Sequence, residues 1–295
     1  MAKRSWSKAP NTLIIGDTHL PFTLPEYLDF TCDLRRKYKC KRVVHIGDFI
    51  DNHALNYHEH NPDGMSSGDE AKAVRDMSKD WIKAYPDLYI CIGNHDALAF
   101  RKAVTHGITA SWLSTFNQYL GTPESWQWAL RWEFGGVQYT HGTGFSGRNA
   151  AITAASKSRQ STVIGHAHSY AGIQYSASEV NLLFGMNVGC GIDNTSYAFD
   201  YGKLHPDKPV ISAGIVIEDR FPILEIADLG SRVALVKNPG IKRSKDPVAV
   251  MNMSRDELKE ELRKMKVQYN PKANTPALRS IYARSYHLAQ LRQEK

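Results

Sequence analysis

The stretch Gly93-Asn94-His95-Asp96 decides how the sequence is interpreted. It follows Asp-Leu-Tyr-Ile-Cys-Ile at 87–92, an apolar run bounded by turn residues, which predicts a buried strand. Packing alone poorly explains a strand that ends at glycine and then presents an amide, an imidazole and a carboxylate. Open α/β sheets bind ligands beyond the carboxyl ends of their strands. We therefore expect a functional site at this strand end.

Four other apolar runs end in the same way. Gly16-Asp17-Thr18-His19 follows the run 11–15, and Gly47-Asp48-Phe49-Ile50-Asp51 follows 42–46. His141-Gly142 follows 136–140, and Gly165-His166-Ala167-His168 follows 161–164. We predict helices between these runs, over 26–39, 69–84 and 147–159. Strand, helix and strand in this order imply parallel strands joined by crossovers, so their polar ends should converge. The fold class predicted is α/β.

The remaining segments of this part of the chain are less regular. Residues 181–188, 210–217, 221–226 and 232–236 predict strands of a second sheet, without clear helices between them. Residues 97–135 hold Trp112, Trp126, Trp128 and Trp132. One interpretation of these tryptophans is a helical insert packed on the sheet, since large aromatic side chains mostly fill cores. The other is a stacking surface for bases.

The strand-end residues together predict a metal site. Singly they are weak signals, because an Asp-x-His can be a capped turn and a Gly-Asp pair is common. Gly-His-x-His is stronger, since alternate residues of an extended chain point to opposite sides and can reach two ions. A mixture of carboxylate, imidazole and amide ligands suits Mn, Fe or Zn better than a thiolate site would.

The order Asp-x-His, Gly-Asp-x-x-Asp, Gly-Asn-His-Asp, His and Gly-His-x-His resembles the calcineurin-like metallophosphoesterase family over roughly residues 11–190. The resemblance implies a double β-sheet sandwich flanked by helices, with two divalent metal ions. Mn²⁺ is the expected metal, with Fe or Zn as alternatives. By position, one metal would be held by Asp17, His19 and His168, the other by Asn94, His141 and His166, and Asp48 would bridge the two.

The same resemblance suggests how catalysis is divided among the residues. Two ions about 3.5–4 Å apart can clamp a phosphoryl group and generate hydroxide, but the leaving oxygen still needs a proton. His95 would be this general acid, and Asp51 would orient its imidazole. The alternative for Asp51 is a strand-end cap, and Asp96 is expected to be structural. His53 and Arg148 are candidate substrate contacts, or else ordinary solvated side chains.

Two departures from a subfamily bear on the substrate. The protein Ser/Thr phosphatases of this family carry Arg-Gly after the second Asp and Glu after Asn-His. Here Asn52 follows Asp51, and Asp96 follows His95. This pattern resembles the phosphodiesterase and nuclease branches instead.

The charge of the chain is concentrated near its C-terminal end. The formal net charge is +7, which indicates a polyanionic partner. Residues 1–236 carry 23 Lys and Arg against 24 Asp and Glu, whereas residues 237–295 carry 14 against 6. We predict a catalytic domain over 1–236, a linker over 237–253 that contains Pro239-Gly240 and Asp246-Pro247, and a basic helical module over 254–295.

The basic module has its own pattern. Ser254-Arg255-Asp256-Glu257 is a capping box that predicts a helix start, and Thr275-Pro276 predicts a second one. With the extended stretch 267–271 between them, they resemble the helix-extension-helix modules related to SAP and LEM domains, which implies DNA binding. A packed helical hairpin or a solubilising tail is the alternative.

The remaining features exclude some classes of protein. The four cysteines form no C-x-x-C pair, which predicts a reduced, cytoplasmic protein. The polar first ten residues predict no signal peptide, and no apolar run approaches the ~18 residues needed to span a bilayer.

The predicted function is two-metal phosphodiester hydrolysis on nucleic acid, with DNA as the first expectation. The alternatives are a phosphodiesterase or phosphatase for small nucleotides or phosphorylated ends, and a catalytically dead scaffold. The intact ligand set argues against the scaffold. The sequence does not indicate an oligomeric state.

Overall fold

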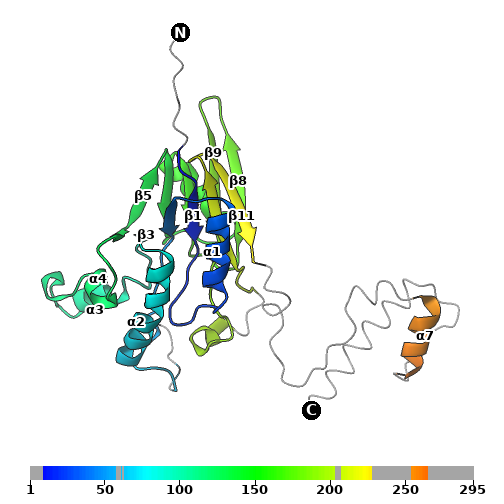
Figure 1. Cartoon of the computed structure of the whole chain (residues 1–295), viewed down its shortest axis with the longest axis horizontal. Coiled ribbons are helices and arrows are strands. Elements are labelled where there is room, and N and C mark those ends of the chain that lie inside the picture. The colour runs from blue at the N-terminus through cyan, green and yellow to red at the C-terminus, as the bar shows by residue number, and fades with distance from the viewer. Residues whose placement is uncertain (1–8, 58–60, 62, 203–206, 228–253, 265–295) are drawn as a thin grey trace, which may run out of the picture. The chain divides into compact units, whose positions relative to one another are not determined.

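Two sets of parallel strands bring the strand-end motifs to one edge of the fold (Figure 1). The computed structural model describes residues 9–57, 61, 63–202, 207–227 and 254–264. The chain divides into two units, Met1–Val233 and Ala234–Lys295.

The first sheet has six strands in the order β11-β10-β1-β2-β3-β4. They are β1 (Thr12–Ile15), β2 (Arg42–His45), β3 (Leu88–Cys91), β4 (Trp126–Ala129), β10 (Ser212–Ile217) and β11 (Phe221–Ile226). Neighbours from β1 to β4 are parallel, whereas β10 pairs antiparallel with β1 and β11. The segments that follow β1, β2 and β3 therefore lie at the same edge.

The second sheet has five strands in the order β5-β6-β7-β9-β8. They are β5 (Arg131–Phe134), β6 (Val137–Thr140), β7 (Ser161–Ile164), β8 (Ala171–Ala177) and β9 (Leu182–Val188). Strands β6, β7 and β9 are parallel, so the residues after β6 and β7 also meet at one edge.

Alternation along the strands builds the layers of the first unit. Ile14 points to the second sheet and packs in one core with Val163 and Met186. Its neighbours Leu13 and Ile15 point the other way, into a core with α1 (Tyr27–Lys37) and α2 (Ser67–Ala84). Figure 1 shows these two helices on the same side of the six-stranded sheet. Helix α5 (Ala150–Ser158) packs on β7, β8 and β9 of the second sheet. The predicted sandwich of two sheets flanked by helices is confirmed. The strands predicted at 210–217 and 221–226 were expected in the second sheet, but they form β10 and β11 of the first, where β10 pairs with β1.

Most predicted elements are present, and several were missed. The strands predicted at 11–15, 42–46, 87–92, 136–140 and 161–164 are confirmed, and 232–236 lies outside the described residues. The sequence did not indicate β4, β5 or β8. Helices α3 (Leu98–Thr105) and α4 (Phe116–Leu120) lie in the insert 97–135, which one interpretation expected to be helical. The sequence also missed the 3-10 turns η1 (His53–Leu55), η2 (Ala110–Trp112) and η3 (Tyr197–Gly202), the last in a stretch expected to lack helices.

Three of the four tryptophans in the insert are packed against the protein. The Trp126 indole is fully buried and donates to the Tyr85 carbonyl at 2.8 Å. Trp128 stacks on Phe116 with ring centroids 4.4 Å apart, and the Trp132 indole donates to the Ile90 carbonyl. Trp112 is 81% exposed. The packing interpretation therefore fits all of them except Trp112.

In the second unit, the structure describes α7 (Arg255–Lys264) and the residue before it. Ser254 Oγ accepts from the Glu257 amide at 3.3 Å, and a Glu257 carboxylate oxygen accepts from the Ser254 amide at 2.7 Å. The predicted capping box is thus confirmed. The linker 237–253 and the second predicted helix lie outside the described residues. Among the residues described, the helices are all too short or too polar to cross a membrane.

Candidate metal centre

The five strand ends bring their carboxylates and imidazoles into one cluster. Potential ligand atoms lie within 4.8 Å of one another in three groups: Asp17, His19 and His168; Asp48, His141 and His166; and His19, Asp48 and His95. The first two groups contain the carboxylate and imidazole residues predicted for each metal. The amide of Asn94 joins the second, with its Oδ1 2.9 Å from His141 Nε2.

Asp48 lies between the two predicted ligand sets. Its Oδ2 is 3.1 Å from His141 Nε2 and 3.6 Å from His19 Nε2. On the other side of the cluster, Asp17 Oδ2 is 2.9 Å from His168 Nε2. Asp48 therefore occupies the position that a bridging carboxylate needs.

Two glycines of the motifs allow backbone amides to approach these carboxylates. A Cβ at Gly93 would lie 2.0 Å from Asp48 Oδ1, and one at Gly165 would lie 2.1 Å from Asp17 Oδ1. Without those Cβ atoms, the His95 amide donates to Asp48 Oδ1 and the His166 amide donates to Asp17 Oδ2, both at 2.8 Å. The glycines thus fix the carboxylates against the following loops.

Four non-glycine residues of these loops have left-handed backbones. They are His19 (φ 48°), Asp48 (φ 48°), Asn52 (φ 53°) and His166 (φ 65°). Conformations of this kind cost of order 1–3 kcal/mol each and persist where the surroundings over-determine them, which is common at functional sites.

Buried polar atoms in the cluster lack hydrogen-bond partners. Among the described residues, this holds for Asp17 Oδ1 and His19 Nε2. An unsatisfied buried polar group costs about 1–3 kcal/mol. A divalent cation bound to these atoms would remove that cost, so the donor set fits a metal.

The charges of the cluster also favour cations. Burial by itself would raise the pKa of Asp48, but the charges of His141 and His95 hold this pKa well below its usual range. Burial likewise opposes the shift at Asp51, whose hydrogen bonds from His19 and His95 lower its pKa to about 2. Buried carboxylates held ionised in this way need positive charge beside them, which divalent metal ions would supply.

The pKa values of His95 and His141 are raised, in contrast to those of the carboxylates Asp48 and Asp51. Burial would lower the pKa of both His95 and His141, yet the nearby carboxylates, Asp48 foremost, raise these pKa values to about 10 and about 9.

Asp51 contacts two histidines rather than one. Its Oδ1 accepts from His19 Nδ1 at 2.5 Å and lies 3.3 Å from His95 Nδ1, and its backbone carbonyl accepts from His95 Nδ1 at 2.7 Å. The sequence prediction concerned His95 alone. The contact to His19 was missed, and it leaves His19 Nε2 free to bind a metal.

Sequence reasoning also missed His45. Burial lowers the pKa of this histidine to about 3, so the ring is neutral. Its Nδ1 accepts from the Gly47 amide at 3.2 Å, and its Nε2 lies 3.1 Å from the Thr18 hydroxyl, which donates to the Phe49 carbonyl. His45 therefore ties the loop after β1 to the loop after β2. The signal in the sequence was a histidine inside an apolar strand.

The carboxylates of Asp96 and Glu70 accept hydrogen bonds from backbone amides near the centre. The two oxygens of Asp96 accept from the amides of Ile50 and Gly93, which agrees with the structural role expected for it. Glu70, which the sequence did not indicate, accepts from the amides of His53 and Ala54 at 2.8 and 3.0 Å. It fixes the turn η1 beside the centre.

The two predicted substrate contacts have different surroundings. His53 is buried against Phe22 and Tyr197, with its Nδ1 3.9 Å from Asp51 Oδ2. Arg148 is exposed in the segment between His141 and α5, and its guanidinium carbon is 6.0 Å from the centroid of the Tyr170 ring. The structure brings His53 next to the cluster and records no contact of Arg148 with it. Both roles stay predictions.

The sequence profile of the family "Calcineurin-like phosphoesterase" matches residues 10–192. The chain belongs to this family, which makes it a metallophosphoesterase and places it among metal-dependent phosphoesterases. No curated protein matches the chain by sequence.

Solved structures that are similar to the chain share little sequence with it. Vacuolar protein sorting 29 from Cryptosporidium parvum is 12% identical, with a TM-score of 0.36, over 74% of this chain and 96% of that one. Yfce, a phosphoesterase from E. coli, is 18% identical, with a TM-score of 0.36, over 75% of this chain and 94% of that one.

Proposed function

We propose that the chain is a two-metal phosphodiesterase that acts on nucleic acid, with DNA as the expected substrate and Mn²⁺ as the expected metal. The observation that carries the proposal is the convergence of all predicted carboxylate and imidazole ligands into three adjacent groups, two of which contain Asp48. The partnerless atoms Asp17 Oδ1 and His19 Nε2 support it, since they are satisfied once a cation is bound.

The protein's own residues position and protonate the substrate. When bound, the two ions would polarise the phosphoryl group and lower the pKa of a water molecule. His95 donates Nδ1–H to the Asp51 carbonyl, which leaves Nε2–H to protonate the leaving oxygen. Asp51 holds His19 and His95 at once, so it couples the orientation of a metal ligand to that of the acid.

A diester substrate fits the two departures from the phosphatase pattern. Asn52, at the position of the phosphatase arginine, donates from Nδ2 to the His95 carbonyl at 2.9 Å. Asp96, at the position of the phosphatase glutamate, is engaged by the amides of Ile50 and Gly93. Asn52 and Asp96 therefore hydrogen-bond to the backbone of neighbouring loops, and neither supplies a positive charge for a terminal phosphate.

The basic C-terminal region supports a nucleic-acid substrate. Residues 237–295 carry 14 Lys and Arg against 6 Asp and Glu, and α7 begins at the capping box expected for a helix-extension-helix module. Lysines and arginines that neutralise phosphates supply most of the sequence-independent affinity for nucleic acid. We propose this module as the nucleic-acid handle.

A substrate panel with added Mn²⁺ tests the proposal. The full chain should hydrolyse bis-p-nitrophenyl phosphate faster than p-nitrophenyl phosphate, and it should cleave oligonucleotides. A strong monoester preference without oligonucleotide cleavage would contradict the proposal and favour a small phosphorylated substrate.

Removing the basic module separates binding from chemistry. Truncation near Asn238 should leave hydrolysis of the small diester nearly unchanged, because every predicted ligand precedes residue 190. In fluorescence anisotropy without metal, the truncated chain should bind duplex DNA more weakly, with a salt slope that is smaller by about 0.9 for each phosphate that the module neutralises. Equal affinity and slope for the two chains would show that the module is not the handle.

A further inference from the structure

Cations and aromatic rings gather on and beside the segment that follows the general acid His95. The residues are Tyr57, Arg101, Lys102 and Trp112, here called the cation–aromatic patch. Helix α3 begins at Leu98, three residues after His95. At a rise of about 1.5 Å per residue, Arg101 and Lys102 lie within roughly 6 Å of its start along the axis.

Contacts tie this patch to the loops of the metal centre. The Arg101 guanidinium carbon and Lys102 Nζ lie 5.4 and 4.7 Å from the centroid of the Tyr57 ring. Lys102 Nζ also donates to the Asn56 carbonyl at 3.4 Å. Asn56 directly follows η1, whose preceding residue, Asn52, donates to the His95 carbonyl. The patch therefore borders the strand end that carries His95.

Packing does not account for these side chains. Within the described ranges, neither Arg101 nor Lys102 has a carboxylate at ion-pair distance. Tyr57 is 57% exposed and Trp112 is 81% exposed, on the turn η2 that packs against α3. The other tryptophans of the insert are packed against the protein, so Trp112 stands apart.

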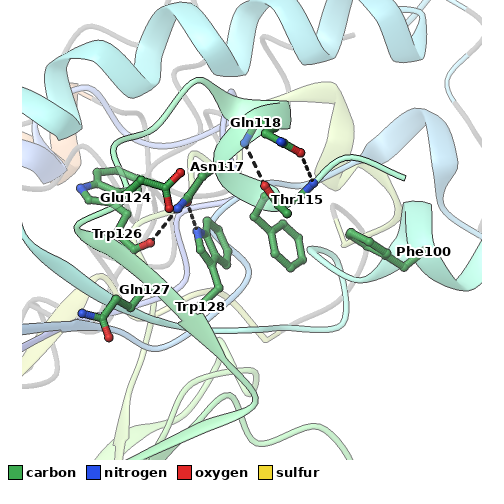
Figure 2. Close-up of a pocket in the computed structure, with 9 residues that line it drawn as sticks. Phe100, Thr115, Asn117, Gln118, Glu124, Trp126, Gln127 and Trp128 are labelled. Carbon is green, nitrogen blue, oxygen red and sulfur yellow. Dashed lines mark hydrogen bonds between the residues drawn. The ribbon is translucent and has the colours of Figure 1, made fainter. Parts of the chain in front are cut away.

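A pocket with several aromatic side chains lies near the patch and is distinct from it (Figure 2). It is lined by Phe100, Thr115, Phe116, Asn117, Gln118, Glu124, Trp126, Gln127 and Trp128. Asn117 Nδ2 donates to the Trp126 carbonyl, and Asn117 Oδ1 accepts from Trp128 Nε1. Figure 2 shows the Asn117 amide turned toward Trp126 and Trp128, so this amide is engaged by the pocket's own side chains and backbone.

We infer that the cation–aromatic patch is a subsite for the nucleotides that flank the scissile phosphate of single-stranded nucleic acid. The inference rests on the proposed function and adds a specificity-determining surface to it. Arg101 and Lys102 take a flanking phosphate, as cations do along single strands. Tyr57 and Trp112 offer ring faces on which bases stack whatever their sequence.

The test compares substrate lengths with the Mn²⁺-loaded full chain. For the wild type, kcat/KM should rise about tenfold from a dinucleotide to a single-stranded hexanucleotide, as one more phosphate contact and one more stacked base would give. In the variant Arg101→Gln/Lys102→Gln, kcat/KM should be nearly the same for the two substrates, mainly because KM for the hexanucleotide rises. Trp112→Ala should lose part of the gain.

Matched variants control for charge and folding. Arg36→Gln/Lys37→Gln removes the same charge at the end of α1, where the two cations pair with Asp33 and Glu225, and it should keep the gain. The swap Arg101→Lys/Lys102→Arg preserves the charge and should restore most of it. Bound metal and thermal melting show that each variant is folded.

The outcomes separate the subsite from the proposed function. A full length gain in a folded Arg101→Gln/Lys102→Gln variant overturns the subsite and leaves the nuclease proposal standing. A wild type that hydrolyses bis-p-nitrophenyl phosphate but no oligonucleotide overturns both.

Discussion

The metal centre and the aromatic pocket are both lined by polar side chains, but they differ in how those side chains are satisfied. In the pocket, Thr115 and Gln118 form a complete capping box, and Asn117 bonds to both Trp126 and Trp128. In the centre, Asp17 Oδ1 and His19 Nε2 are buried without a partner in the described part of the chain.

The metal centre and the pocket also differ in backbone conformation. The centre holds His19, Asp48 and His166 with positive φ, whereas the residues that line the pocket include none. Unsatisfied polar atoms together with backbone strain distinguish a site that requires a ligand from a hollow that stabilises the fold. Each prediction below tests this difference.

The largest effect is expected for Asp48→Asn. The substitution removes the charge that lies between His19 of one ligand group and His141 of the other, so bound metal and activity should be lost together. We expect the rate of diester hydrolysis to fall by about 10³-fold or more, since both ions act on the phosphoryl group. Elemental analysis of the purified variant measures its metal content. Two ions retained by the variant would refute the bridging assignment.

His95→Asn should leave the metals bound and slow the chemistry. The loss of a general acid reduces the rate by roughly 10²–10⁴-fold. Because the third ligand group includes His95 with His19 and Asp48, metal analysis decides between the two roles. If metal loss matched that of Asp48→Asn, His95 would be a ligand.

Gly93→Ala should weaken the centre through packing alone. The new Cβ would lie 2.0 Å from Asp48 Oδ1, so the carboxylate must move. Overpacking of this kind costs about 1–3 kcal/mol, and metal affinity should fall with it. Gly172→Ala is the matched control, since a Cβ there meets nothing within 4 Å. Similar denaturant curves and metal affinities for the two variants would contradict the account.

Asn117→Ala should affect stability without affecting catalysis. It leaves Trp128 Nε1 and the Trp126 carbonyl without their partner, at a cost of about 1–3 kcal/mol in the free energy of unfolding. Urea unfolding measures this cost, and diester hydrolysis at saturating Mn²⁺ should match the wild type. A large loss of activity in the folded variant would mean that the pocket belongs to the site.

The fold and the ligand cluster followed from one regularity of the sequence. Polar residues such as Asp17, Asn94 and His166 come directly after short apolar runs, and parallel strands carry such ends to a common edge. The helices between these runs were predicted separately, from the spacing of their apolar residues. Neither prediction required knowledge of side-chain contacts.

The remaining features depend on contacts between distant residues. Strand β4 has four residues, so the alternation of Trp126, Gln127 and Trp128 is too short to mark it as a strand. The Asp51–His19 contact depends on the relative placement of two loops, which no local pattern encodes. The contact between His45 and Thr18 also joins two distant segments. A histidine within an apolar strand is compatible with many partners, so the sequence did not predict this one.

The most direct test of the central claim is a metal titration that follows binding and hydrolysis together. Chelator-treated full chain is titrated with Mn²⁺ while bound metal and bis-p-nitrophenyl phosphate hydrolysis are measured on the same samples. The account predicts no hydrolysis in chelator, two ions bound per chain at saturation, and activity that follows their occupancy. Full hydrolysis by metal-free protein, or saturation without any gain in activity, would contradict it.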